Sequence, residues 1–400
     1  MSFKLLKSAK TSLLLGSSII GVIAILVFGF LTYKNNTSKN TLTAAFASLQ
    51  SEKDQTAQTL SSVQKELDDL KNSDQVKRND ELEAKIGDLQ KAYDGAVSAY
   101  EDLLDLKAKV TNTKELDALF AKVLKQLSDK DYEGGTKTLA DLNQKIKDET
   151  SKVVTAAATI PANVPVNNAP PGSGYSRQSV STDSGTFLVS LVAGDLGSTK
   201  VIVDTASDSD CHDNCPVLPL ATYVSRNGAY AGINGSYFCP AAYPTCAGKT
   251  NSFDLLLMNK NKHYFNSDNN VYSNNPGVIF GSGYIRFVGA VSQWGRDTGI
   301  DSMLSNYPLL VQGGNITFGG NDDPKQGSKG GRSFVANKGN VVYIGVVSNA
   351  TVAESARVMK AMAMENALNL DSGGSTALWS GGYKVGPGRD LPNVILFVRK

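Results

Sequence analysis

Histidine is almost absent from this 400-residue sequence, which contains only His212 and His263. The sequence also lacks a Gly-x-Ser-x-Gly nucleophile elbow and a phosphate-binding P-loop. A Ser-His-Asp hydrolase is therefore disfavoured. An excess of charge of one sign is lacking as well, because 40 basic residues face 38 acidic ones, for a net charge of +2. Such a chain has no general field that attracts polyanions, so we expect no nucleic-acid partner.

Cysteine is also scarce, and its four copies lie in one short stretch: Cys211, Cys215, Cys239 and Cys246. In an oxidising compartment, four clustered cysteines are expected to form two disulfides, with three possible connectivities. A zinc site is the alternative, because Cys211, His212, Cys215 and Cys239 could supply four ligands, although their spacing fits only loosely.

The N-terminal segment contains an uncharged apolar run at residues 11–33, preceded by Lys4, Lys7 and Lys10. About 20 apolar residues cross a bilayer as a helix, and the lysines favour a cytoplasmic N-terminus. We therefore expect a transmembrane signal anchor within residues 1–48, with a single-pass cell-membrane location and an extracytoplasmic C-terminal part. A cleaved signal peptide, processed near Ala45-Phe-Ala47, is the alternative and also exports the rest of the chain.

Residues 49–155 have the charge-rich periodicity of long helices, with one narrow apolar stripe. Spacings of three and four, typical of a coiled-coil seam, join Leu60, Val63, Leu67 and Leu70. The pattern resumes at Leu82, Ile86, Leu89, Tyr93, Val97, Tyr100 and Leu104, and a further helical pair is expected around the turn at residues 129–131. We predict an all-α coiled-coil or helical-hairpin stalk, whose seam needs a hairpin mate or a second chain. A homo-oligomer, in which the stalk is structural, is therefore possible.

Residues 156–176 contain four prolines and two glycines without apolar periodicity, which predicts an extended linker. In residues 177–400 the pattern changes to short β-branched runs broken by glycine, asparagine and proline. One helix is expected at residues 352–364, where Thr351-x-x-Glu354 forms a capping box. This pattern predicts an α/β domain of the mixed α+β kind.

The strongest chemical signal is the segment Ala367-Leu-Asn-Leu-Asp-Ser-Gly-Gly-Ser-Thr376. Strand alternation places Asn369 and Asp371 on one face. The following Gly373, Gly374 and Ser375 can turn backbone N–H groups toward an anion. A glycine-rich turn with a capping aspartate is the alternative.

Two further motifs carry polar groups beside glycines. Asn234-Gly235 lies in Gly232-Ile-Asn-Gly-Ser-Tyr-Phe238, and Arg332 follows Gly330-Gly331. Asparagine can orient a sugar or phosphate, Gly235 permits close approach, and arginine binds phosphate oxygens in a planar, bidentate way. A tight Asn-Gly turn, a glycosylation sequon at 234–236 and a surface arginine are the alternatives.

Taken in order, these motifs resemble the phosphodiester glycosidase family. The resemblance rests on Asn-Gly-x-Tyr-Phe238, Tyr307-Pro-Leu-Leu-Val-Gln-Gly-Gly314, Gly331-Arg332, Asn369-Leu-Asp-x-Gly-Gly-Ser-Thr376 and Arg389-Asp-Leu-Pro-Asn393. It covers about residues 184–400 and nothing before the linker. The family usually has a glycine directly after the aspartate, where this chain has Ser372.

The resemblance implies hydrolysis of a sugar-1-phosphodiester, such as an N-acetylglucosamine-1-phosphodiester, to the sugar and a phosphomonoester. The substrate would be an envelope or exopolysaccharide glycan. Asp371 would act as base, nucleophile or oxocarbenium stabiliser, while Arg332 and the backbone of Gly373–Ser375 neutralise phosphate charge. Asn234 and Asn369 would orient the substrate. A second carboxylate is not identified, with Asp204 and Asp254 as candidates. The alternative function is a non-catalytic glycan or phosphate binder on a helical stalk.

No metal or cofactor is required by this chemistry. Calcium is possible at two acidic loops, Asp208-x-Asp210 and Asn321-Asp-Asp323, because carboxylate and amide oxygens suit a hard cation.

Overall fold

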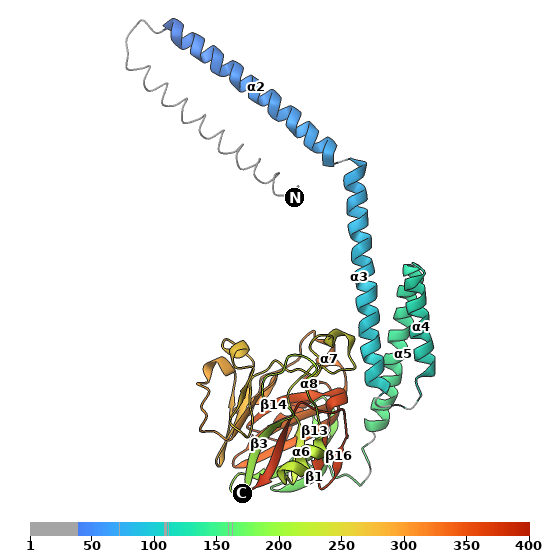
Figure 1. The fold of residues 1–400 in the computed structure, drawn as a ribbon, viewed down its shortest axis with the longest axis vertical. Coiled ribbons are helices and arrows are strands. Elements are labelled where there is room, and N and C mark those ends of the chain that lie inside the picture. Colours follow the sequence, from blue (N-terminus) through green and yellow to red (C-terminus); the bar gives the residue numbers. More distant parts are fainter. Residues whose placement is uncertain (1–38, 72, 108–109, 111, 159, 162) are drawn as a thin grey trace. The chain divides into compact units, whose positions relative to one another are not determined.

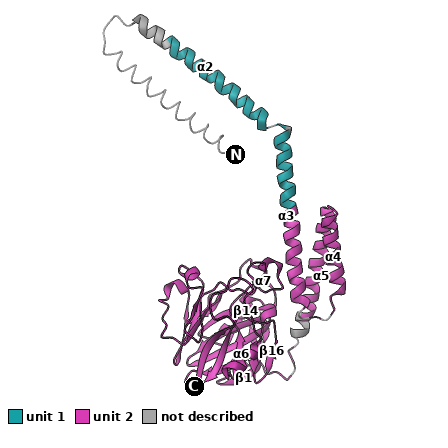
Figure 2. Ribbon diagram, viewed as in Figure 1, with its two compact units in different colours: residues 1–88 teal, residues 89–400 magenta. Residues whose placement is uncertain are grey.

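A computed structural model describes residues 39–400, except residues 72, 108–109, 111, 159 and 162. The chain divides into two compact units, residues 1–88 and residues 89–400 (Figure 2). Helix α3 (Asp74–Lys107) contributes to both units.

The first unit contains helix α2 (Lys39–Lys71) and the beginning of α3. The apolar stripe predicted as a coiled-coil seam is solvent-exposed here, since Leu60, Val63, Leu70, Leu82 and Ile86 each expose at least half of their surface. An exposed stripe with heptad spacing is typical of a helix that pairs with another helix. A second copy of the chain remains the expected partner.

The prediction of a transmembrane anchor needs correction. No helix among the described residues is long and apolar enough to cross a membrane. The predicted span itself, residues 11–33, lies outside the described residues. The structure therefore gives no support to an N-terminal transmembrane helix or to a single-pass membrane location. The fold class is corrected to a mixed α+β domain with a helical N-terminal region.

In the second unit, the end of α3 packs with α4 (Lys114–Ser128) and α5 (Tyr132–Ala158). The apolar face of α3 is shifted from the predicted one. The buried residues are Ala92, Ala96, Ala99, Leu103 and Leu106 rather than the predicted Tyr93, Val97, Tyr100 and Leu104. Small alanines allow a close helix contact, and a Cβ added at Gly95 would lie 3.0 Å from Leu139. Of the larger side chains next to them, Tyr93 is exposed, and Val97, Tyr100 and Leu104 are half-buried.

Three antiparallel sheets form the C-terminal domain (Figure 1). The seven-stranded sheet has the order β1 (Gly174–Thr182), β2 (Gly185–Asp195), β13 (Val341–Ala350), β12 (Gly330–Lys338), β14 (Asn366–Ser372), β10 (Leu309–Gln312) and β11 (Asn315–Ile316). One five-stranded sheet has the order β16 (Tyr383–Val385), β15 (Leu378–Ser380), β4 (Ala231–Asn234), β17 (Asn393–Arg399) and β3 (Thr199–Thr205). The other has the order β6 (Tyr264–Phe265), β5 (Leu257–Met258), β9 (Ser302–Ser305), β7 (Gly277–Gly281) and β8 (Tyr284–Val288).

The central core joins all three sheets. Its buried side chains include Ile233 of β4, Leu304 of β9, Ile344 of β13 and Leu368 of β14. Burial of apolar surface on this scale is the main favourable contribution to folding.

Two helices cover outer faces of the sheets. Helix α8 (Val352–Ala361) packs on the face of the seven-stranded sheet that points away from the central core. Helix α6 (Leu220–Asn227) packs on one face of the five-stranded sheet that contains β4 and β17. Helix α8 begins with the predicted capping box, in which Thr351 and Glu354 bond each other's backbone N–H groups.

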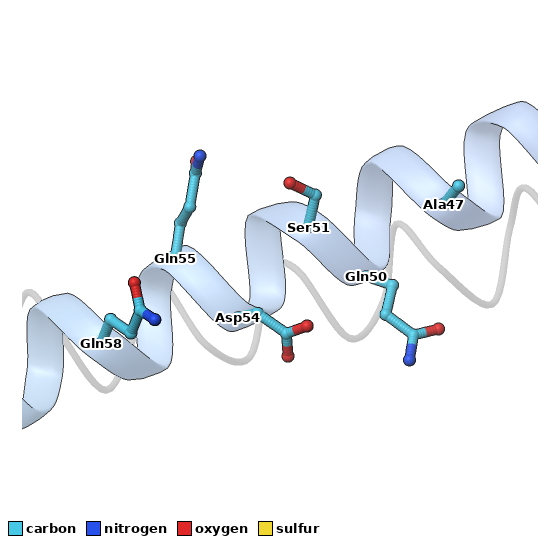
Figure 3. A pocket seen from close by; sticks show the side chains of 6 residues that line it. All are labelled: Ala47, Gln50, Ser51, Asp54, Gln55 and Gln58. Carbon is cyan, nitrogen blue, oxygen red and sulfur yellow. The ribbon is translucent and has the colours of Figure 1, made fainter.

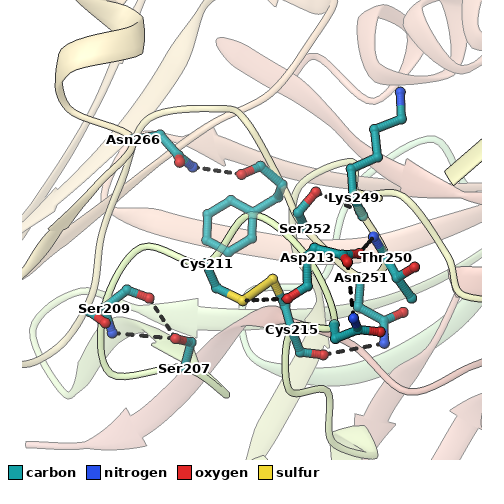
Figure 4. The surroundings of a disulfide bond; sticks show 12 residues. Ser207, Ser209, Cys211, Asp213, Cys215, Lys249, Thr250, Asn251, Ser252 and Asn266 are labelled. Carbon is teal, nitrogen blue, oxygen red and sulfur yellow. Dashed lines mark hydrogen bonds between the residues drawn. A yellow bond between two sulfur atoms is a disulfide. The ribbon is translucent and has the colours of Figure 1, made fainter. Parts of the chain in front are cut away.

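The four cysteines pair locally, as Cys211–Cys215 and Cys239–Cys246. Two disulfides are therefore confirmed, and no thiolate remains at these positions to bind zinc. Around the first disulfide, Asp213 accepts a hydrogen bond from the backbone N–H of Thr250 at 2.7 Å, which ties the two cysteine-containing loops together (Figure 4).

Candidate active site

The candidate site centres on Asp371, at the end of β14. Leu368 and Leu370 both lie in the central core, whereas Asn369 and Asp371 both lie beside Tyr237. The two polar residues thus share one side of the strand, as predicted. The strand pair contains a bulge at this point. Arg332 of β12 pairs with Ser372 of β14, and Phe334 pairs with Asn369. Two residues of β12 therefore lie opposite three residues of β14. Bulges re-aim side chains at the ends of strands, and no residue pattern in this segment indicates the bulge.

Burial controls the ionisation of Asp371. Loss of hydration raises the pKa of its carboxyl from 3.8 to about 6. Smaller effects oppose the rise: hydrogen bonds from the Ser375 hydroxyl and from the Ser372 backbone N–H (2.8 Å), and the positive charge of Arg389. A carboxyl with a raised pKa next to a cation is typical of a functional site.

The glycine turn after Asp371 has the expected conformation. Gly373 has a left-handed φ of 65°, and a 3-10 turn follows at Gly373–Ser375. A left-handed residue followed by helical ones turns successive N–H groups toward one side, which suits an anion. Ser372 is extended, with φ −139° and ψ −174°, a conformation open to any residue. Serine in place of the family's usual glycine therefore causes no backbone strain.

Arg389 is the functional candidate that the sequence analysis missed. Its guanidinium lies against Gly374, where an added Cβ would come within 2.1 Å of Nη2. Its backbone N–H donates to the carbonyl of Gly374 at 2.9 Å, and its guanidinium lies 5.2 Å from the ring centre of Tyr243. Its positive charge also interacts with the carboxylate of Asp371. Residues 389–393 carry the family resemblance as a motif, and nothing in their spacing indicates that the arginine folds back over the turn.

Arg332 lies next to the site and is bound mainly by the protein itself. It is opposite Ser372 across the β12–β14 pair and only 5% exposed. Its Nε donates to the carbonyl of Ala350 and its Nη2 to that of Lys325, both at 2.9 Å, with a further bond to the carbonyl of Ser328. These bonds hold the segment that includes α7 (Pro324–Gly327) against the sheet.

Asn234 and Gly235 hold the backbone of Asp371 through hydrogen bonds. Asn234 is fully buried, and its Nδ2 donates to the carbonyl of Asp371 at 2.6 Å. Its Oδ1 accepts from the Ser333 hydroxyl at 2.8 Å and from the backbone N–H of Ala377 at 3.1 Å. The carbonyl of Gly235 accepts from the N–H of Asp371, and a Cβ at Gly235 would collide with Oδ1 of Asn393 at 1.9 Å. These contacts fix β14 relative to β4 and β12.

Asn369 connects the aspartate strand to two tyrosines. Its Nδ2 donates to the hydroxyl of Tyr237 at 2.7 Å and to the carbonyl of Tyr307 at 3.1 Å. The two rings lie 5.0 Å apart. Burial raises the pKa of Tyr237, so its hydroxyl keeps its proton. Asn369 itself is fully buried, and its Oδ1 has no hydrogen-bond partner.

The remaining acidic candidates have other surroundings. Asp204 is 2% exposed and accepts from Arg226 at 2.7 Å and from Asn227 at 2.6 Å, whereas Asp254 is exposed. In the acidic loops, Asp210 accepts from the N–H of Asn266 and Asp323 caps α7. Among the described residues, no three or more His, Cys, Asp or Glu side chains group as metal ligands.

A hollow along α2 is unrelated to this chemistry. All six of its lining residues come from that single helix, and Asp54 is the only titratable one (Figure 3).

Comparison with known proteins identifies the domain. Residues 227–398 match the phosphodiester glycosidase family. No curated protein matches. A solved structure of a hypothetical protein from Synechocystis is 14% identical, with a TM-score of 0.39, over 56% of this chain and 62% of that one. The chain thus spans less than two thirds of that protein.

A second solved structure is the catalytic domain of zebrafish N-acetylglucosamine-1-phosphodiester alpha-N-acetylglucosaminidase, auto-inhibited by its pro-peptide. It is 14% identical, with a TM-score of 0.44, over 59% of this chain and 87% of that one. The family match covers all five motifs in full and ends within β17. Residues 227–398 therefore form a phosphodiester glycosidase domain, as the ordered motifs predicted.

Proposed function

We propose that the domain hydrolyses a sugar-1-phosphodiester to the free sugar and a phosphomonoester. The observation that carries this proposal is the meeting of Asp371 and Arg389 at the Gly373–Ser375 turn. A carboxylate beside a guanidinium and a glycine turn matches a substrate with a reacting sugar carbon beside a phosphate.

In the reaction, the bond between sugar C1 and the phosphate oxygen breaks, and a bond from C1 to a water oxygen forms. The electron pair of the broken bond stays on the phosphate oxygen, and the water loses one proton. A phosphate ester is a good leaving group, so general-acid help matters less than in ordinary glycosidases. Asp371 would stabilise positive charge at C1 or accept the proton of water.

Arg389 takes the charge-neutralising role that the sequence predicted for Arg332, beside the backbone of Gly373–Ser375. A guanidinium held against a turn can bind two phosphate oxygens at once. Three buried residues would act without touching the substrate, by holding the strand ends and the two tyrosines in place: Arg332, Asn234 and Asn369. The Oδ1 of Asn369 is buried there without a hydrogen-bond partner.

Two disulfides indicate that the domain folds outside the reducing cytosol. We propose that its substrates are extracellular glycosyl phosphates, such as those of envelope or exopolysaccharide material.

The test is turnover of a panel of glycosyl phosphodiesters, beginning with an N-acetylglucosamine-1-phosphodiester, by the full chain. Asp371→Asn should lower kcat/KM by about 10²- to 10⁴-fold, the range for a general base. Asp322→Asn, which alters an exposed loop aspartate, should leave it unchanged. Binding of the panel without any turnover would favour the non-catalytic binder instead.

A further inference from the structure

Helix α3 brings two carboxylates to the catalytic domain from outside the family segment. Glu101 and Asp105 lie four residues apart near its end, so they share one face of the helix. Both contact residues of the glycosidase domain. The apolar stripe of this segment predicts only a structural role for it.

Glu101 is the fixed contact of the two. It is 6% exposed, and its carboxylate accepts hydrogen bonds from the backbone N–H of Thr245 at 3.3 Å and from the Thr245 hydroxyl. Thr245 belongs to the loop that the Cys239–Cys246 disulfide closes. Nζ of Lys325 lies 3.7 Å away. A buried carboxylate is tolerated only with such partners, so this contact anchors the helix.

Asp105 is the contact at the site. Its Oδ1 accepts from Nη2 of Arg389 at 2.8 Å. Its Oδ2 lies 4.0 Å from the position that a Cβ on Gly373 would occupy, so the carboxylate lies over the glycine turn. Both members of the ion pair are partly solvent-exposed, at 24% for Arg389 and 29% for Asp105. Arg389 can therefore exchange the Asp105 carboxylate for water or another anion, whereas Glu101 stays bound to its partners.

We propose that Asp105 occupies the anion position of the site, so that α3 competes with the substrate phosphate for Arg389. The identity of that anion rests on the proposed function. Two anions cannot share one guanidinium edge without strong repulsion. A phosphodiester must displace Asp105 from Arg389, while Glu101 keeps the helix attached. The helical segment thus sets the affinity of the site for anions.

The test is calorimetric titration of the full chain with inorganic phosphate. Asp105→Asn keeps the side-chain shape and removes the competing charge, so phosphate affinity should rise about threefold to fivefold, the range of a partly exposed ion pair. Asp94→Asn, a matched change at an exposed position of α3, should leave the affinity at the wild-type value. Arg389→Gln added to Asp105→Asn should abolish the gain.

Unchanged or weaker phosphate binding by Asp105→Asn would overturn the proposal, because Asp105 would then be a structural partner or a ligand of the substrate. The result is independent of turnover. A gain in phosphate affinity without hydrolysis of any phosphodiester would refute the proposed function and leave the competition intact. If the chain hydrolyses a phosphodiester but Asp105→Asn leaves phosphate affinity unchanged, the proposed function stands and the competition is refuted.

Discussion

Replacing Asp371 by asparagine should stabilise the folded domain at neutral pH, although it removes a residue of the candidate site. Burial makes the ionised carboxylate unfavourable in the fold, as its raised pKa records. Asparagine has nearly the same shape and no charge, and its Oδ1 can still accept from the N–H of Ser372. If the Asp371 carboxylate stabilised the fold instead, the same substitution would lower the free energy of unfolding at neutral pH.

The size of the effect follows from the pKa. A rise from 3.8 to about 6 is about two pKa units, and each unit corresponds to about 1.36 kcal/mol. The ionised side chain therefore costs the wild-type fold roughly 3 kcal/mol above pH 6, if the unfolded chain has the ordinary pKa. Allowing for a poorer bond to Ser375, we expect a gain of about 2 kcal/mol for Asp371→Asn at pH 7.5.

The sign depends on pH. Because the folded pKa is raised, the neutral form stabilises the fold fully below the unfolded pKa, and that stability is lost as pH rises through the folded value. The advantage of asparagine should thus be absent near pH 3.5, grow between about pH 4 and 6, and stay constant above pH 7. Urea unfolding followed by tryptophan fluorescence measures it, since both tryptophans, Trp294 and Trp379, lie in this domain.

The control is Asp322→Asn, which should not change the free energy of unfolding at about pH 3.5 or at about pH 7.5. A loss of stability in Asp371→Asn at pH 7.5 would refute the reasoning. It would mean that Arg389 and the surrounding hydrogen bonds stabilise the carboxylate more than burial destabilises it.

Three further changes test the remaining contacts. Gly374→Ala should displace the Arg389 guanidinium, which an added Cβ would approach to 2.1 Å, and lower kcat/KM on a phosphodiester about tenfold or more, whereas Gly330→Ala, with open space around it, should not. Thr351→Ala should cost about 1 kcal/mol of unfolding free energy in urea by removing the cap of α8, with unchanged kinetics, and unchanged stability would refute the cap's role. Removing the Cys239–Cys246 disulfide by a double serine substitution should cost about 2–3 kcal/mol in the same assay and release the loop that holds Glu101, and a variant as stable as wild type would contradict this.

The sequence determined much of the domain and its chemistry. Turn glycines, β-branched runs and the Thr351–Glu354 capping box are local signals, so they predicted a mixed α+β domain and the start of α8 correctly. The alternation in β14 placed Asn369 and Asp371 together for the same reason. The order of the motifs identified the family, because each motif carries its own local geometry. The transmembrane prediction at residues 11–33 also rested on local composition and found no support among the described helices.

Only the tertiary structure decided which distant groups meet. The cysteine pairing, the packing of Arg389 on Gly374 and the contact of Asp105 with Arg389 all join segments whose separation carries no periodic signal. The shifted apolar face of α3 has the same origin, since helix packing selects small alanines over larger neighbours. Local residue preferences fix the conformation of a turn or a strand, whereas the environment of a charge depends on everything that packs around it. The raised pKa of Asp371 is therefore a property of the fold and cannot be read from the motif that contains it.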